Sequence, residues 1–246
     1  MAEQPKSVLI CGESGAGKSY CLRNIQNQEG VLYFNCEGGK PLPFRNKFKH
    51  ITVNDPEEIF VYLQKVIDNP HKFHTIIIDT ISFMMERFES VHVIGSQNTM
   101  AAWGDYAQFF KTLMYDYIAK LTCASIMLGH VEGILDEASG RWSYSVPVKG
   151  SLKKNGLEAY FTTVIGAKKL PIRDIEKDAK EGPCLTITER ERERGYKHVF
   201  QTQTTRSTIG DRLRSPFGLF SDDETFIEND AQIILDRINS YYADAA

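Results

Sequence analysis

Apolar residues are arranged along the chain in two ways, as short unbroken runs and as longer stretches with helical spacing. Unbroken runs of roughly four to eight residues, bounded by glycine or polar residues, are typical of strands buried on both faces of a parallel sheet. We therefore expect strands at Ser7–Cys11, Val31–Cys36, His50–Val53, Thr75–Asp79, Ala124–Leu128 and Ala159–Ala167.

Helical spacing of apolar positions appears between and after these runs. We expect helices over residues 16–26, from 55 to about 67, over 99–121 and, amphipathic, over 229–242. The second helix has a clear start, because Asp55 is a good N-cap, Pro56 suits the first helical position and Glu58 follows at the third. Strands that alternate with helices predict an α/β fold in which helices flank a mostly parallel central sheet.

Two further segments interrupt this alternation. Residues 134–148 predict a β-hairpin with its turn at Ala138–Ser139–Gly140. After about residue 170 the chain becomes more polar and charged, and the short run ERERER (residues 189–194) predicts a solvated strand edge or a turn. We interpret residues 1–246 as one domain, with a core at about 6–170 and a C-terminal, β-rich extension at about 171–246.

Composition excludes several classes of protein. Hydrophobic residues make up 42% and charged residues 25%, which is usual for a globular chain, and the net charge of −3 does not by itself indicate a nucleic-acid binder. The five cysteines form no CxxC pair, and no apolar run has membrane-spanning length. We expect a cytoplasmic protein with no membrane partner, which would act in the host cytoplasm if a phage encodes it.

The strongest motif follows the first expected strand. GESGAGKS fits GxxxxGK[ST] at every fixed position, and this pattern predicts a loop whose backbone amides hold phosphate groups. Lys18 should reach the β- and γ-phosphates, and the Ser19 hydroxyl should bind Mg²⁺. The predicted nucleotide-binding residues are Gly12, Glu13, Ser14, Gly15, Ala16, Gly17, Lys18, Ser19 and Tyr20.

Three polar residues end other expected strands. Asp79 ends TIIID, where an acid can orient a water bound to Mg²⁺, although a strand-end acid can also be a simple cap. Glu37 ends YFNCE and is a candidate to align or deprotonate the attacking water; the alternative is a surface turn residue before two glycines. His130 follows IMLG and could sense the γ-phosphate or be a strand-end histidine satisfied by backbone.

Taken in order, GESGAGKS, YFNCE, IIIDT and IMLGH resemble the RecA-like core ATPases. The resemblance implies ATP and Mg²⁺ as cofactors, Glu37 as the catalytic glutamate, and His130 as the residue that couples the γ-phosphate to a DNA-binding loop. More narrowly, the chain resembles the compact phage ATPases of the Sak type, which are associated with single-strand annealing and recombination. Only six residues precede the first expected strand, so we expect no counterpart of the usual RecA polymerisation helix and no filament formed through it.

The same resemblance implies a homo-oligomer, single-stranded DNA as a ligand and a single-strand-binding protein as a candidate partner. Arg212 and Arg214 occupy a late segment from which basic residues can act on a neighbouring subunit's γ-phosphate. Loops near residues 88–103 and 131–155 would face DNA. In the second loop basic and aromatic residues alternate, which suits single strands: Arg141, Trp142, Lys149, Lys153 and Lys154.

Our leading hypothesis is an ATPase of DNA recombination. Two alternatives remain open, a P-loop kinase of nucleotides or small molecules, and an ATP-dependent assembly module that binds no DNA. A kinase requires an arginine-rich lid, and the alternating acids of ERERER make that run a poor one.

Overall fold

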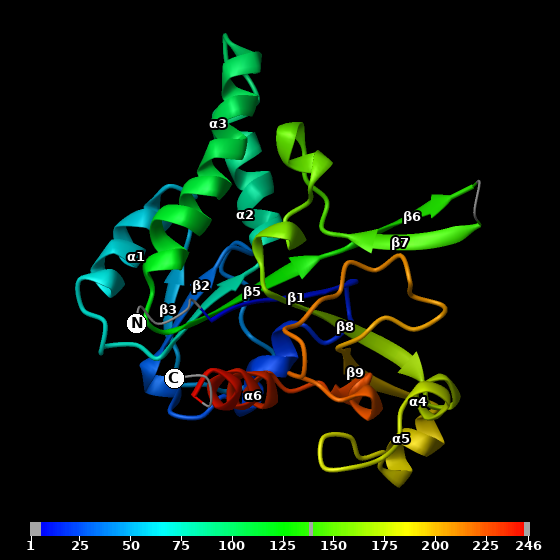
Figure 1. Cartoon of the computed structure of the whole chain (residues 1–246). Helices are drawn as coiled ribbons and strands as arrows, with labels where there is room; N and C mark the ends of the chain where they lie inside the picture. The colour runs from blue at the N-terminus through cyan, green and yellow to red at the C-terminus, as the bar shows by residue number, and fades with distance from the viewer. Residues whose placement is uncertain (1–5, 138–139, 244–246) are drawn as a thin grey trace.

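An eight-stranded sheet forms the centre of the computed structural model, which describes residues 6–137 and 140–243 and, of Asp136 and Arg141, the backbone only (Figure 1). The strands lie in the order β10-β9-β8-β1-β5-β4-β2-β3. Their bounds are β1 Ser7–Gly12, β2 Val31–Asn35, β3 Lys49–Thr52, β4 Thr75–Asp79, β5 Ala124–His130, β8 Thr163–Pro171, β9 Tyr196–Gln201 and β10 Phe226–Glu228.

The six strands from β8 to β3 are parallel, and β5 lies between β1 and β4. The register aligns their carboxyl ends: Gly12 pairs with His130, and Asp79 pairs with Asn35. Ligands of parallel sheets bind outside these ends. The expected α/β architecture with a mostly parallel sheet is therefore confirmed, and the register gathers the polar strand ends at one edge.

Helices cover both faces of the sheet. One face packs against α1 (Glu58–Ile67), α2 (Ile81–Phe88) and α3 (Thr99–Thr112), while the other packs against a 3₁₀ helix at Ser19–Asn24 and α6 (Ala231–Ala243). Successive strand residues alternate between these two cores, since Leu9 faces the first and Ile10 the second. Both cores are apolar, which explains the unbroken apolar runs.

The C-terminal extension joins the same sheet. β9 pairs antiparallel with β8, and β10 pairs antiparallel with β9. The extension that we expected to be rich in β structure also contains α4 (Ile172–Asp178), α5 (Glu189–Arg194) and α6. It therefore adds helices as well as strands, and its strands extend the sheet beyond β8 (Figure 1).

A two-stranded hairpin projects away from the main sheet (Figure 1). β6 (Glu132–Asp136) follows β5 after one residue and pairs antiparallel with β7 (Arg141–Ser145). The predicted hairpin is thus confirmed, while its predicted turn residues Ala138 and Ser139 lie outside the described residues.

Several local predictions were wrong or displaced. ERERER is α5, because Thr188 and Glu191 form a capping box and Gly195 ends the helix at φ +78°. The last predicted strand starts four residues late, at Thr163, because Glu158–Tyr160 forms a 3₁₀ turn first. Most of the presumed loop at 88–103 is helical, and α2 was not anticipated. No helix among the described residues is long and apolar enough to cross a membrane.

Candidate functional site

The GESGAGKS segment forms a tight loop between β1 and the 3₁₀ helix at Ser19–Asn24. Gly15 and Gly17 have φ of +76° and +93°, a region that L side chains rarely adopt. At Gly12 a Cβ would lie 2.3 Å from the carbonyl oxygen of Ala167 on β8. Glycine is therefore required at these three positions by the backbone itself, as the phosphate-loop pattern predicts.

Lys18 is held at the base of this loop, and only 6% of its surface is exposed. Its Nζ donates to the carbonyl oxygens of Gly12 and Glu13, each at 2.8 Å, and lies 3.2 Å from Nδ1 of His130. Burial lowers the pKa of Lys18, while Asp79 and Glu37 oppose that shift. The loop thus holds the Lys18 amine beside the position that a phosphate group would take. Its three N–H donors are satisfied by Gly12, Glu13 and His130.

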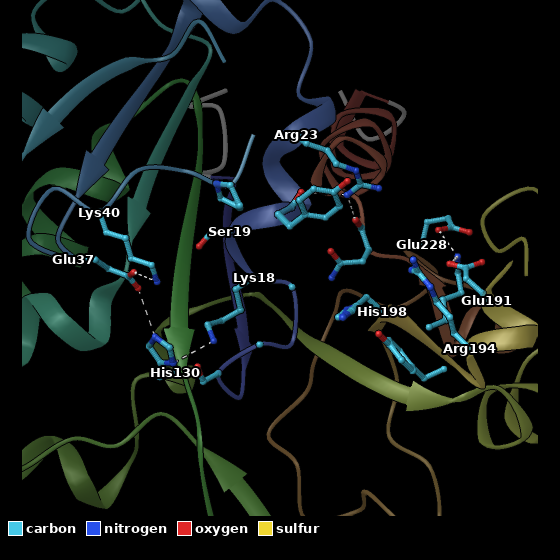
Figure 2. Close-up of a pocket in the computed structure, with 18 residues that line it drawn as sticks. Lys18, Ser19, Arg23, Glu37, Lys40, His130, Glu191, Arg194, His198 and Glu228 are labelled. Atoms are coloured by element: carbon cyan, nitrogen blue, oxygen red, sulfur yellow. Dashed lines mark hydrogen bonds and ion pairs between the residues drawn. The ribbon is translucent and has the colours of Figure 1, made fainter. Parts of the chain in front are cut away.

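His130 links Lys18 to Glu37 (Figure 2). An ammonium group can only donate, so Nδ1 of His130 must accept, and the proton of a neutral imidazole then resides on Nε2. Nε2 lies 3.6 Å from Oε1 of Glu37, which is longer than a hydrogen bond but within ion-pair range. The backbone N–H of His130 donates to Ser82 Oγ at 2.9 Å and fixes the end of β5.

Glu37 is positioned by a turn built on Asn35, the last residue of β2. Oδ1 of Asn35 accepts from the backbone N–H groups of Glu37 at 3.0 Å and Gly39 at 3.2 Å. Gly38 and Gly39 have φ of +66° and +82°, so the chain turns away directly after the acid. Together, nearby His130 and the amine of Lys40, 3.2 Å from Oε2, lower the pKa of Glu37. At neutral pH this side chain is an ionised carboxylate, as a general base must be.

Asp79 lies beside the loop at the end of β4 and is almost fully buried, with 2% of its surface exposed. Oδ2 accepts from the hydroxyl of Tyr33 at 2.8 Å, while Oδ1 has no hydrogen-bond partner among the described residues. Burial raises the pKa of Asp79, against the hydrogen bond from Tyr33. A buried carboxylate oxygen without a donor fits an oxygen-ligated cation such as Mg²⁺, with the Ser19 hydroxyl as the second predicted ligand.

Lys18, Glu37 and His130 line one wall of a cleft of about 650 Å³. The C-terminal extension supplies the opposite wall, where Glu191, Arg194, His198 and Glu228 face Lys18 across the opening (Figure 2). Of the predicted nucleotide-binding residues, six line the cleft directly: Ser14, Gly15, Gly17, Lys18, Ser19 and Tyr20. Gly12, Glu13 and Ala16 complete the loop behind them.

The two predicted trans-acting arginines do not line this cleft. Arg212 lies 3.2 Å from Oε2 of Glu158 and donates to the carbonyl of Asn155, so its guanidinium has a structural role within its own chain. Arg214 pairs through its backbone with Val164 of β8, and its side chain is exposed. An action of either residue on a neighbouring subunit stays a prediction.

The predicted DNA-binding residues fall into different surroundings. Trp142 on β7 is 52% exposed and stacks on Tyr144 at 6.4 Å between ring centroids. Lys149 lies 2.7 Å from Glu89, so its charge is already paired, while Lys153 and Lys154 are exposed on a 3₁₀ turn. The side chain of Arg141 lies outside the described part of the structure. These assignments also remain predictions.

Sequence reasoning missed the residues that position the site. Tyr33 and Ser82 are ordinary strand and helix residues whose hydroxyl groups contact Asp79 and His130. Asn35 could have been found from the sequence, because an asparagine three residues before a Gly-Gly pair favours a turn that its side chain caps. No sequence pattern indicated the cleft wall formed by α5, β9 and β10, because those segments lie more than 150 residues beyond the phosphate loop.

Comparison with known families agrees with this geometry. The profile of a family described as AAA domain matches residues 4–210, which is most of the chain. No curated protein sequence matches it.

Proposed function

We propose that this chain, which belongs to the AAA domain family of P-loop ATPases, couples ATP hydrolysis to the binding of single-stranded DNA in recombination. In the proposal the protein acts as a homo-oligomer, as the resemblance to the Sak-type ATPases implies. The domain itself supports the binding and hydrolysis of ATP. The proposal adds single-stranded DNA as the ligand, a homo-oligomer as the assembly and recombination as the process.

The cleft has the groups that hydrolysis requires. The Glu37 carboxylate takes a proton from water, the water oxygen forms a bond to the γ-phosphorus, and the bond from that phosphorus to the β–γ bridging oxygen breaks. ADP and phosphate leave. Lys18 offsets the negative charge of the transferred group. Mg²⁺, when bound near Ser19 and Asp79, would neutralise charge on the β- and γ-phosphates.

The observation that carries the DNA part of the proposal is the path of the chain after β5. His130 lies between Lys18 and Glu37, and the next residue, Val131, donates its N–H to the carbonyl of Gly12 at 3.3 Å. β6 begins at Glu132. A phosphate group that changes the position of His130 would therefore act on the base of the hairpin, which begins two residues later along the backbone.

The hairpin offers the kind of surface that stacks on bases. Trp142 and Tyr144 lie over Gly133 of β6, where an added Cβ would be 2.9 Å from the Tyr144 ring. Lys168 lies 5.8 Å from the centre of that ring. The apolar side chains of Ile134 and Leu135 are 60% and 43% exposed. Exposed aromatic and apolar side chains on a projecting hairpin favour a ligand-binding surface over a hairpin that serves only to keep the protein soluble.

The test is the affinity for a fluorescently labelled oligo-dT strand, measured by anisotropy with a non-hydrolysable ATP analogue. Trp142→Ala removes one stacking ring and should weaken binding by about 5- to 150-fold, the range for loss of one base–aromatic stack. The matched control is Tyr115→Ala, because Tyr115 is 63% exposed but belongs to the helical segment after α3. Equal affinity of wild type and Trp142→Ala would contradict the assignment of the hairpin, and no binding by wild type would contradict the DNA ligand.

A further inference from the structure

Asn229, the residue after β10, has an unusual environment. It is 4% exposed, and neither Oδ1 nor Nδ2 of its side chain has a hydrogen-bond partner in the described residues. The residue borders the nucleotide cleft, and its amide packs against Gly17, where a Cβ would lie 3.2 Å from Oδ1. A buried donor and acceptor without partners are costly, so a ligand that satisfies both would be favoured.

The position of Asn229 is fixed by the phosphate-loop helix. Nη1 of Arg23 donates to the backbone carbonyl of Asn229 at 2.7 Å. The following residues make two further contacts with the same helical segment: Asn24 donates to Asp230 at 2.6 Å, and the N–H of Gln26 donates to Gln232 at 2.9 Å. The backbone that carries Asn229 is therefore held in place beside the cleft before any ligand arrives.

Three ring side chains line the same cleft as this amide. Tyr20 lines the cleft, is 49% exposed and has the Arg23 guanidinium 4.4 Å from its ring centre. Tyr196 and His198 line the cleft from β9. Glu191 and Glu228 also line the cleft, and Lys197 lies 2.7 Å from the first and 3.0 Å from the second. Because Lys197 offsets their negative charge, the two acids do not strongly repel a nucleotide.

We propose that Asn229 recognises the adenine base of the bound nucleotide, in a base subsite formed with Tyr20 and with Tyr196 and His198 of the C-terminal extension. This inference rests on the proposed ATPase function and names its nucleobase. The 6-amino donor of adenine lies next to a ring-nitrogen acceptor on both of its hydrogen-bonding edges. The Asn229 amide offers the complementary acceptor and donor, whereas guanine has two acceptors on its N7 edge.

The experiment compares ATP with purine riboside triphosphate, which is ATP without the 6-amino group, and with tripolyphosphate, which has no base. Equilibrium dissociation constants are measured with Mg²⁺ for wild type, for Asn229→Leu and for Asn69→Leu, an exposed control at the end of α1. Leucine keeps the approximate shape of asparagine and removes both polar atoms. Lys18→Ala serves as the variant that should bind neither nucleotide.

We expect wild type to bind ATP about 5- to 150-fold more tightly than purine riboside triphosphate, the discrimination of one good bidentate pair. In Asn229→Leu that ratio should fall close to one, while the affinity for tripolyphosphate stays the same. Asn69→Leu should behave as wild type. Without nucleotide, Asn229→Leu should melt at the same temperature as wild type or higher, because the lost polar atoms had no partners.

Three results would overturn the inference. An unchanged ratio in Asn229→Leu would remove Asn229 from base recognition, and a matching loss of tripolyphosphate affinity would make the residue a support of the phosphate loop. Tighter binding of GTP than of ATP by wild type would exclude adenine as the base. If wild type bound neither ATP nor tripolyphosphate, the proposed ATPase function itself would fail, which separates the two failures.

Discussion

Lys18, His130 and Glu37 form a row of contacts in which each side chain determines the state of the next. Lys18 donates to His130, which leaves the imidazole proton on Nε2, facing Glu37. This arrangement keeps the carboxylate ionised and aimed into the cleft. It also means that a phosphate group competing for Lys18 changes the contacts of His130, and with them the surroundings of the general base.

Glu37→Gln tests the role of the carboxylate. Glutamine retains the size and keeps an amide oxygen that can accept hydrogen bonds, but it cannot take a proton from water. We expect the rate of phosphate release to fall by about 10²- to 10⁴-fold while the dissociation constant for ATP stays unchanged. Steady-state phosphate release and ATP binding measure the two quantities.

Lys18→Ala is the contrasting variant, because it should lose nucleotide binding as well as turnover. A Glu37→Gln protein that turns over ATP as fast as wild type would show that another group activates the water.

Asp79→Asn tests the cost of the buried carboxylate. Burial raises the pKa of Asp79, so the folded state binds this proton more tightly than the unfolded state. Its contribution to the free energy of unfolding therefore decreases as pH rises from the ordinary aspartate pKa through the raised one. At neutral pH the ionised group destabilises the free protein, and asparagine should raise the melting temperature by about 2–4 °C for each kcal/mol relieved.

The measurement is thermal unfolding without Mg²⁺ or nucleotide at pH 7 and near pH 4.5. The advantage of Asp79→Asn should shrink at the lower pH, where wild type is more protonated. The variant should also lose the extra stability that Mg²⁺ and ATP give to wild type. A lower melting temperature than wild type in the free state would mean that the Asp79 charge stabilises the fold.

The turn after β2 shows how an element, and not only a residue, prepares the site. Asn35 is 5% exposed and binds the N–H groups of Glu37 and Gly39 and, through Nδ2, the carbonyl of Lys40 at 2.7 Å. Asn35→Ala should loosen this turn and lower kcat, with a smaller change in KM for ATP, because the phosphate loop is untouched.

Asn46→Ala is the matched control for Asn35→Ala. Asn46 also caps a loop, accepting from the N–H of Phe48 at 3.1 Å, and its hydrogen bonds within the described part of the chain go to Phe44, Phe48 and His50 rather than to the turn that holds Glu37. Steady-state kinetics of both variants separate the two cases. Equal kcat values in the Asn35 variant and wild type would show that the turn does not position the base.

The elements that the sequence predicted well are those whose pattern is local and strong. TIIID became β4 with the predicted bounds, because a central strand is apolar on both faces. The prediction for ERERER was wrong because alternating charges do not distinguish a strand edge from a helix. Thr188 followed three residues later by Glu191 is a helix-start pattern, and these residues form the capping box of α5. The late start of β8 depends on Glu158, a buried acid whose partners Val146 and Arg212 are distant in sequence.

In the complete fold, one face of the nucleotide cleft could be predicted and the other could not. The phosphate loop, Glu37, Asp79 and His130 belong to strand ends whose convergence follows from parallel pairing. The facing wall depends on β9 and β10, which extend the sheet antiparallel and bring Tyr196, His198 and Asn229 to the loop. No local pattern encodes that contact, because it results from tertiary packing.

The chain runs from His130 in the cleft through Val131 directly into β6 of the projecting hairpin. A ligand on the hairpin and a nucleotide in the cleft should therefore affect each other's binding reciprocally. The decisive measurement is the rate of phosphate release from ATP and Mg²⁺ with and without single-stranded oligo-dT. We predict a measurable basal rate that the single strand increases, with both rates lost in Glu37→Gln. ATP hydrolysis that no single strand of any length alters would contradict the proposed coupling, and an absence of hydrolysis under both conditions would contradict the ATPase account.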